Sequence, residues 1–367
     1  MKKRYLRISK RATLLLCLLV TYIITVSAQF TQKRILERTE PVRQGNALEI
    51  NNKYGKIEIT LWNRDSVYIR TEIQANASTQ SRTDKMLSGI RVDFETTQYL
   101  IRAKTVFDPS PGMLIESFKG MTSKVLNFDS GIEISYYVKI PRYMSLRLDN
   151  RYGDVFMEDI KGDLRLNLSN GSFKAGSVEG SCELNLDLAN AVIYKTTLCR
   201  IDGSFSEILM NEADAMTINS ISSRFETGNI TDLTIESRRD KIFIRSLGTL
   251  RGNSYFSHVR IDRLISEADI DARYGNLTIS EIDKTFKKIN IRSGYSDIYL
   301  TFGKSASYNL YLRHTNTFVS LPQEGADFEK KAVNEERKEY ITTGTIGRPA
   351  GKQQVDIEAN RGTVSLK

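Results

Sequence analysis

The chain is poor in the residues that build many metal and catalytic sites. Its 367 residues include two His, three Cys and one Trp. Two His cannot supply a three-histidine zinc site, and three Cys cannot supply a four-cysteine site. The sequence also lacks a Gly-x-Ser-x-Gly elbow, a P-loop and a dinucleotide-binding fingerprint. We therefore expect no metal, no cofactor and no catalytic residue.

The positive charge of the chain is concentrated at its start. Six of its 53 Lys and Arg residues lie in the first 11 positions, which contain no acid, and an apolar run from Ala12 to Ala28 follows. This pattern is typical of an export signal, and Val26-Ser27-Ala28 ends in a residue small enough for signal peptidase. Cleavage leaves 47 basic and 44 acidic residues. The mature chain then has no strong electrostatic reason to bind nucleic acid.

Residues 1–28 are thus predicted to be a cleaved signal peptide. The alternative is that Ala12–Ala28 stays as a membrane anchor, which its short length disfavours. No later segment is apolar enough to cross a bilayer as a helix, so no transmembrane span is expected after cleavage. We expect the protein in the periplasm or at the cell surface of a Gram-negative bacterium. The sequence does not distinguish between these two locations, and it leaves the oligomeric state open.

Beyond Phe30 the apolar residues alternate with polar ones, as in Ile57-x-Ile59, Val67-x-Ile69 and Ile132-x-Ile134. Such alternation places every second side chain on one face of a sheet. No stretch has a convincing apolar period of 3.6 residues. The chain is therefore predicted to be almost wholly β.

The alternating segments repeat. An apolar residue opens one strand of each unit, and these anchors are spaced by 18, 20, 15, 17, 17, 17, 18 and 21 residues. They are Val155, Phe173, Ile193, Ile208, Phe225, Ile242, Val259, Leu277 and Ile298. Apolar ladders also stand nine and seven residues before the anchors and five residues after them. Constant offsets of this kind indicate coils that bury the same positions against their neighbours.

A small residue stands two positions before eight of the nine anchors, as at Gly153, Gly171 and Ser257. A tight corner between stacked strands demands such a residue. The fold class predicted here is all-β, a single-stranded parallel β-solenoid with short coils of about 15–21 residues and capped ends. Similar units precede the array at Leu48/Ile50 and follow it at Val355/Ile357.

The predicted organisation has four parts: 1–28 signal peptide, 29–145 N-terminal β cap and leading coil, 146–321 regular solenoid array, and 322–367 polar excursion and C-terminal closing coil. The cap contains a predicted loop from Asp108 to Asp129 with two Pro and two Gly residues. The stretch 322–354 is polar and charged, so it is interpreted as a surface excursion.

Two segments carry a resemblance to a known family. These are "LEINNKYGKIEITLWNRDSVYI" and "ISYYVKIPRYMSLRLDNRYGDV", which the coils with Tyr-Gly or Ser-Gly corners follow. Together with the export signal, they resemble the bacterial putative-adhesin family of exported β-solenoid domains. The resemblance covers nearly all of residues 40–367 and implies the fold. It implies no catalytic or binding residue.

The corner position three residues before each anchor is often aromatic. Phe256, Tyr274 and Tyr295 occupy it on successive coils, so they are predicted to form one ladder with a rise of about 4.8 Å per coil. If the ladder is exposed, its rings would be suited to bind the flat apolar faces of sugars. Packed along the corner, it would serve stability alone. We take these three residues as the candidate ligand-binding set, with a glycan or another cell-envelope component as partner.

The favoured function is an exported, non-catalytic, adhesin-like binding or scaffold protein. The alternative is a carbohydrate-active β-helix enzyme, either a polysaccharide lyase or a glycoside hydrolase. Glu267, Asp269 and Asp271 alternate along one strand, with Asp262 nearby, and paired carboxylates are what glycoside hydrolysis needs. Outward Arg residues at 260, 263 and 273 favour a solvated face of mixed charge instead.

Cys182 and Cys199 remain after signal cleavage. The predicted register offsets Cys182 by two residues from the position stacked on Cys199, which places their Cα atoms about 8 Å apart. We therefore expect two buried thiols rather than a disulfide. The sequence leaves the pairing open.

Overall fold

The computed structural model describes residues 30–108, 131–347 and 352–367. The predicted signal peptide and almost all of the predicted loop from Asp108 to Asp129 lie outside these residues. The chain forms two compact units. The first comprises Met1–Arg34, Ile73–Arg91 and Phe107–Glu133, and the second comprises Ile35–Glu72, Val92–Val106 and Ile134–Lys367.

The first unit contains a helix that the sequence analysis does not expect. This helix, α2 (Gln80–Ser88), begins at Thr79, whose hydroxyl accepts a hydrogen bond of 3.3 Å from the Arg82 amide. Its only large buried apolar residues are Met86 and Leu87. Two adjacent apolar residues give no 3.6-residue period, so the pattern could not reveal the helix.

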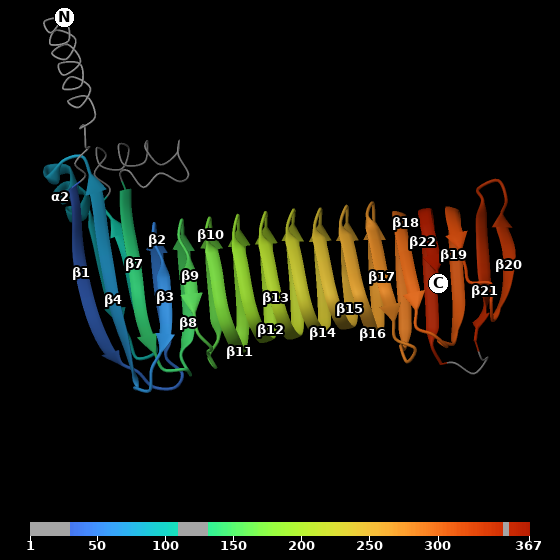
Figure 1. Ribbon diagram of the computed structural model, residues 1–367, viewed down its shortest axis with the longest axis horizontal. Helices are drawn as coiled ribbons and strands as arrows, with labels where there is room; N and C mark the ends of the chain where they lie inside the picture. Colours follow the sequence, from blue (N-terminus) through green and yellow to red (C-terminus); the bar gives the residue numbers. More distant parts are fainter. Residues whose placement is uncertain (1–29, 109–130, 348–351) are drawn as a thin grey trace, which may run out of the picture. The chain divides into compact units, whose positions relative to one another are not determined.

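The rest of the described chain is almost wholly strand, as predicted (Figure 1). The strands are β1 (Phe30–Pro41), β2 (Ala47–Lys53), β3 (Ile57–Leu61), β4 (Ser66–Ala77), β5 (Ile90–Thr96), β6 (Leu100–Phe107), β7 (Gly131–Ile140), β8 (Ser145–Arg151), β9 (Val155–Met157), β10 (Leu164–Ser169), β11 (Ser172–Asp187), β12 (Asn190–Ser204), β13 (Glu207–Ile221), β14 (Arg224–Arg238), β15 (Lys241–Tyr255), β16 (His258–Arg273), β17 (Asn276–Ile282), β18 (Lys288–Phe302), β19 (Tyr308–Ser320), β20 (Ala326–Asn334), β21 (Glu339–Ile346) and β22 (Gln354–Leu366).

The second unit is a parallel β-solenoid, which confirms the predicted fold class. Each of the strands β12 to β16 runs through most of a coil and pairs in parallel with the next. The anchors Ile208, Phe225, Ile242 and Val259 are direct register partners and are at most 1% exposed. Each coil therefore buries its apolar ladder against its neighbours.

One predicted anchor is wrong by two residues. Phe173 pairs with Ala191 rather than with Ile193, and Ala191 in turn pairs with Ile208. The spacings of 20 and 15 residues thereby become 18 and 17. Both Ala191 and Ile193 are buried, so a slip of two residues leaves the apolar pattern unchanged and could not be detected from it.

The residue at each tight corner has a left-handed backbone conformation. Positive φ angles occur at Tyr54, Tyr152, Asn170, Leu188, Phe205, Ser222, Arg239, Phe256, Tyr274 and Tyr295. The amide of each of the first nine donates to a carbonyl of an adjacent coil, as from Phe256 to Arg273 at 2.9 Å. Their side chains therefore form a column along one edge of the solenoid, which we call the corner column. The corrected register replaces Asn190 by Leu188 in it.

The residue after each corner, small except for Asp240, has a second role beyond its size. Five such positions place a side-chain oxygen where it accepts a hydrogen bond from the corresponding amide of the preceding coil. The pairs are Ala189 to Ser206, Ser206 to Ser223, Ser223 to Asp240, Asp240 to Ser257 and Gly275 to Ser296. These oxygens satisfy buried amides that the strand ladder leaves without a partner.

The segment with Leu48 and Ile50 stacks on the first coil of the array. β2 pairs with β8, and β3 pairs with β9. On their other side, β2 pairs with β6 and β3 pairs with β7. β2 and β3 thus form one further coil, made of two separate strands.

The C-terminal strands do not follow the order of the chain. β22 pairs in parallel with β18 on one side and with β19 on the other (Figure 1). The predicted closing coil is therefore inserted into the stack rather than added to its end. The stretch interpreted as a surface excursion contains β20 and β21, an antiparallel hairpin that extends the sheet beyond β19. Its charged side chains suit a sheet end, which needs protection against further pairing.

The two cysteines stack directly, contrary to the predicted offset. Cys182 and Cys199 are register partners, both are buried, and both thiols are free. A hydrogen bond with Cys182, together with burial, holds the pKa of the Cys199 thiol well above its usual range. The two-residue offset predicted for Cys182 came from the same slip at Ala191.

Acid is expected to destabilise the C-terminal hairpin through His314. The imidazole is 4% exposed, stacks on Tyr340 at 5.5 Å, and its Nδ1 has no hydrogen-bond partner. Burial, and then Lys330, lower its pKa. Stability is therefore full above the unfolded-state pKa of about 6.5 and falls as the pH drops through that value towards the folded pKa. Thermal unfolding of wild type should show a loss between pH 7 and 5 that His314→Phe reduces. Equal losses in the two proteins would contradict this role.

Candidate ligand-binding surface

The three predicted ligand-binding aromatics come together in the corner column. The ring centroids of Phe256 and Tyr274 are 4.9 Å apart, those of Tyr274 and Tyr295 are 5.2 Å apart, and both pairs are stacked. The residues are 50%, 49% and 46% exposed. The rings cover each other's faces and present their edges to solvent. The structure thus combines the packing and the exposure that the sequence analysis treated as alternatives.

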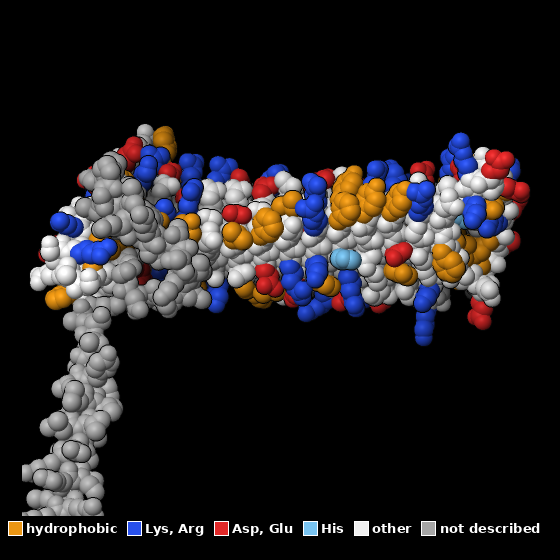
Figure 2. All heavy atoms as spheres, turned by 90° about the horizontal axis from the view of Figure 1, so that it is seen from above, with side chains coloured by type: hydrophobic (Ala, Val, Ile, Leu, Met, Phe, Trp, Pro, Cys, Tyr) orange, Lys and Arg blue, Asp and Glu red, His pale blue; other side chains and the backbone are white. Residues whose placement is uncertain are grey.

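The ladder lies among charged side chains. Figure 2 looks onto the corner side of the solenoid and shows hydrophobic side chains in a row between Lys and Arg side chains. The guanidinium of Arg361 lies 4.8 Å from the Tyr295 ring and covers its outer face. A ligand could therefore reach the edges and hydroxyls of these rings more readily than their faces.

A hollow of about 500 Å³ adjoins Tyr274 and Tyr295. Arg292 and Glu358 line it as cross-strand neighbours, and Gly294 opens it because no side chain stands there. Arg273, also in the lining, donates two hydrogen bonds of 2.9 Å to Asp271. The hollow thus offers hydroxyl, cationic and anionic groups side by side, a set suited to a polyhydroxylated ligand.

The three carboxylates considered for catalysis lie on one strand, but each contacts a different partner residue. Glu267, Asp269 and Asp271 point outward from one face of β16, as predicted. Lys287 lies 3.6 Å from Glu267, and Asn290 donates to Asp269 at 2.7 Å. Asp271 is bound by Arg273. Side chains at alternate positions of one strand stand parallel, so they do not face each other across a bound sugar.

Asp262 does not join the other three carboxylates. It lies on the first half of β16, where it pairs with Arg260 at 3.3 Å, and the coil bends before Glu267. Arg263 pairs with Asp283 instead, at 2.6 Å. These contacts agree with the expected solvated face of mixed charge.

A second feature was missed by the sequence analysis. An open groove of about 830 Å³ runs over the second half of the coils from Asp149 to Tyr255. Its floor carries a polar column in direct register, made of Asp149, Asn167, Asn185, Asp202, Asn219 and Glu236. Neighbours in this column share hydrogen bonds, as from Asn185 to Asn167 at 2.8 Å. The signal was available, because with the corrected anchors each member stands six residues before an anchor.

The histidines build no metal site. The His258 Nδ1 lies 2.7 Å from the Asn276 side-chain oxygen at the surface, whereas His314 is buried. Across the described residues, no three His, Cys, Asp or Glu side chains are grouped as metal ligands would be. Among the same residues, no helix is long and apolar enough to cross a membrane.

Comparisons with known proteins give a structural likeness only. No family model and no curated protein matches the chain. Among solved structures, a putative cell adhesion protein from Clostridium sporogenes is 10% identical, with coverage of 91% of this chain and 99% of that chain at a TM-score of 0.23. A putative adhesin from Bacteroides fragilis is 12% identical, with coverage of 92% and 98% and a TM-score of 0.26.

A putative lipid binding protein from Parabacteroides distasonis is 11% identical, with coverage of 72% of this chain and 93% of that chain at a TM-score of 0.25. At such low identities and TM-scores, these likenesses say nothing about function. The function proposed below therefore rests on the residues of this chain.

Proposed function

We propose that the protein is an exported, non-catalytic binding module that holds a glycan of the cell envelope along its corner column. The observation that carries this proposal is the stacked, half-exposed ladder Phe256, Tyr274 and Tyr295. Core packing does not require these rings, because aliphatic side chains such as Ile242 and Ile261 fill the coil interiors. Adjacent exposed apolar residues of this kind are typical of interaction sites.

The ladder also has a geometry suited to an extended ligand. Its rings are set by the strand spacing, so they repeat about every 4.8 Å along a rigid support. A chain molecule lying along the corner column would meet a ring edge or a tyrosine hydroxyl at each step. The hollow beside Tyr274 and Tyr295 adds the side chains of Arg292 and Glu358. Rigid, repeated contacts lower the entropic cost of binding.

The ion pairs and the placement of the carboxylates on β16 favour binding without cleavage over the enzyme alternative. Glu267 and Asp271 each have a cationic partner within 4 Å, and both lie on one strand. A glycoside hydrolase needs a proton donor and a second carboxylate on opposite sides of the scissile bond. This arrangement is not present at β16.

We also propose that the protein is exported, with cleavage after Ala28 and a final location in the periplasm or at the cell surface of a Gram-negative bacterium. The basic and apolar pattern of residues 1–28 supports export. N-terminal sequencing of exported material should begin at Gln29. Material that still begins at Met1 would show that the apolar run is kept as an anchor.

Substitution of the middle ring tests the proposed function. Tyr274→Ala removes the middle ring and its hydroxyl from the ligand's path and should lower binding on a glycan array by roughly tenfold, which corresponds to about 1.4 kcal/mol of lost contacts with the ligand. Tyr299→Ala is the matched control, because Tyr299 is a similarly exposed tyrosine on β18 outside the column. Binding that both variants weaken equally, or binding by no form of the folded protein, would contradict the proposal.

A further inference from the structure

The corner column has a gap at Ser222, where no large side chain stands. Phe205, Ser222 and Arg239 occupy successive corner positions, and the short side chain of Ser222 leaves a gap between the two larger ones. At 61% exposure, Phe205 is more exposed than any ring of the stacked ladder. A hollow of about 450 Å³ lies here, lined by both neighbours of the gap. One face of the Phe205 ring is therefore open.

The size of the gap matches one flat ring. Phe205 and Arg239 are two coils apart, which is about 10 Å at a strand spacing of about 4.8 Å. Stacked rings in the same column are 4.9 and 5.2 Å apart. A single ring inserted over Ser222 would thus lie at stacking distance from Phe205 on one side and from the Arg239 side chain on the other.

The hollow is electropositive. Three cationic side chains line it, Arg224, Arg239 and Lys241, against one acid, Glu207. Glu207 lies 3.5 Å from Arg224, which also pairs with Glu226. Within the described part of the chain, Arg239 and Lys241 make no ion pair. Two cations beside the open ring face are therefore available to an anion.

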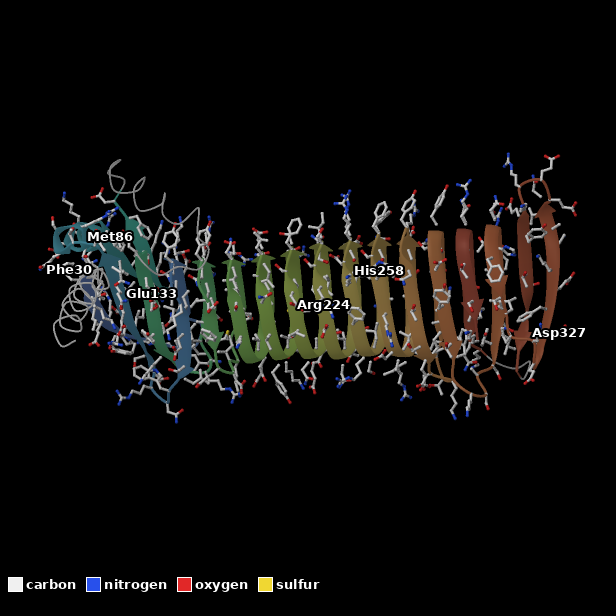
Figure 3. The ribbon with its side chains drawn as sticks, turned by 45° about the horizontal axis from the view of Figure 1, so that its top comes forward. Phe30, Met86, Glu133, Arg224, His258 and Asp327 are labelled. Atoms are coloured by element: carbon white, nitrogen blue, oxygen red, sulfur yellow. The ribbon has the colours of Figure 1, made fainter. Side chains whose placement is uncertain are left out.

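Polar groups complete the lining. The Ser222 hydroxyl and the Asn190 amide face the hollow, and neither side chain makes a hydrogen bond to another described residue. Arg224 and His258, both labelled in Figure 3, lie on the coils on either side of Lys241, at the start of their strands. The hollow thus combines one apolar ring face, two free cations and two free hydrogen-bonding groups.

We propose that this gap, which we call the Ser222 slot, binds one carboxylated pyranose ring of an acidic glycan. The C–H face of the sugar packs on Phe205, its carboxylate binds Arg239 and Lys241, and its hydroxyls bind Ser222 and Asn190. An aromatic side chain of a protein partner could stack on Phe205 but would leave both cations and both polar groups without partners. The inference rests on the proposed glycan-binding function and specifies its ligand class.

The test uses the protein purified from the cells that export it and two probes that differ only at the carboxyl group, which is charged in one and methylated in the other. An oligogalacturonate and its methyl ester share the same rings, and calorimetric titration at low salt measures both. Wild type should bind the acid roughly tenfold or more tightly than the ester, because only the acid engages Arg239 and Lys241. Equal affinities would overturn the acidic specificity.

Ser222→Phe is the decisive variant, because it fills the slot with a ring. Phe205 and Phe256 hold the same backbone conformation, with φ of 49° and 53° against 55° at Ser222, so the variant should fold. It should lower affinity for the acid by roughly tenfold or more. Asn170→Phe adds the same ring at another corner position and should leave affinity unchanged. Arg239→Gln should reduce the preference for the acid over the ester, and the further substitution Lys241→Gln should abolish it.

The outcomes separate the slot from the broader proposal. Full affinity in Ser222→Phe, with loss in Tyr274→Ala, would overturn the slot and leave glycan binding at the ladder intact. An undiminished preference for the acid in Arg239→Gln with Lys241→Gln would also overturn the slot. Failure of wild type to bind any glycan, on the array or in solution, would overturn both. Unchanged thermal unfolding of Ser222→Phe and Asn170→Phe shows that the comparison is between folded proteins.

Discussion

Ile242→Asp is expected to unfold the solenoid array. Ile242 is fully buried, and its register partners Phe225 and Val259 cover it from both sides. A carboxylate there has no cation and no hydrogen-bond donor within the apolar ladder, so the substitution should cost several kcal/mol of unfolding free energy. Because neighbouring coils depend on each other, the loss should spread along the stack.

Chemical denaturation followed by far-ultraviolet circular dichroism measures this effect. Ile242→Val is the control and should cost only about 0.5–1.5 kcal/mol. A native midpoint for Ile242→Asp would mean that position 242 does not face the interior, and the assigned register would then be wrong.

Asp240→Ala is expected to have the second largest effect on stability. The carboxylate is 1% exposed and accepts four hydrogen bonds: from the Ser220 and Ser237 hydroxyls at 2.6 and 2.7 Å, and from the Ser223 and Arg238 amides at 2.7 and 3.0 Å. Alanine would leave the Ser220 hydroxyl and the Ser223 and Arg238 amides without this acceptor, whereas the Ser237 hydroxyl could still donate to Ser257 at 2.9 Å. At about 1–3 kcal/mol for each unsatisfied group, and with partial compensation by water, we expect a loss of about 3 kcal/mol or more.

Asp240→Ser is the matched control, because serine stands at the equivalent corner of the flanking coils, at Ser223 and Ser257. Its hydroxyl can accept from the Ser223 amide, as those serines do, so the cost should be clearly smaller than for alanine. Equal losses in a urea titration would show that the corner oxygen has no part in stability.

Much of the fold could be predicted because every coil buries the same positions and turns at the same kind of corner residue. The ladder of Ile208, Phe225 and Ile242 and the small residues at the corners recur at nearly constant offsets. The failures have a common physical cause. A slip of two residues keeps inward residues inward, so alternation could not choose between Ala191 and Ile193, and the stacking of Cys182 on Cys199 was missed with it.

The C-terminal order could not be predicted from local pattern. β22 has the same ladder residues as any other coil, and nothing in Val355 or Ile357 records that its neighbours are β18 and β19. Likewise, the charges of β20 are typical both of a loop and of an exposed sheet end. Which strands pair over a long separation depends on the whole stack rather than on either segment.

The sequence predicted which aromatic residues share a column, but it did not predict how far their rings are exposed. The constant offset brought Phe256, Tyr274 and Tyr295 into one column, and the structure places them there. Their half-exposed edges could not be deduced, because exposure depends on the left-handed corner. The gap at Ser222 has meaning only once its neighbours Phe205 and Arg239 are known to line one hollow.

We propose that the protein binds glycans without cleaving them. The most direct measurement is to incubate the exported protein with each glycan that it retains on the array and to assay new reducing ends in the same sample. We expect saturable binding with no reducing ends above those of the glycan alone. Release of reducing ends by wild type that is lost in Glu267→Gln or Asp271→Asn would contradict it and would identify the protein as an enzyme.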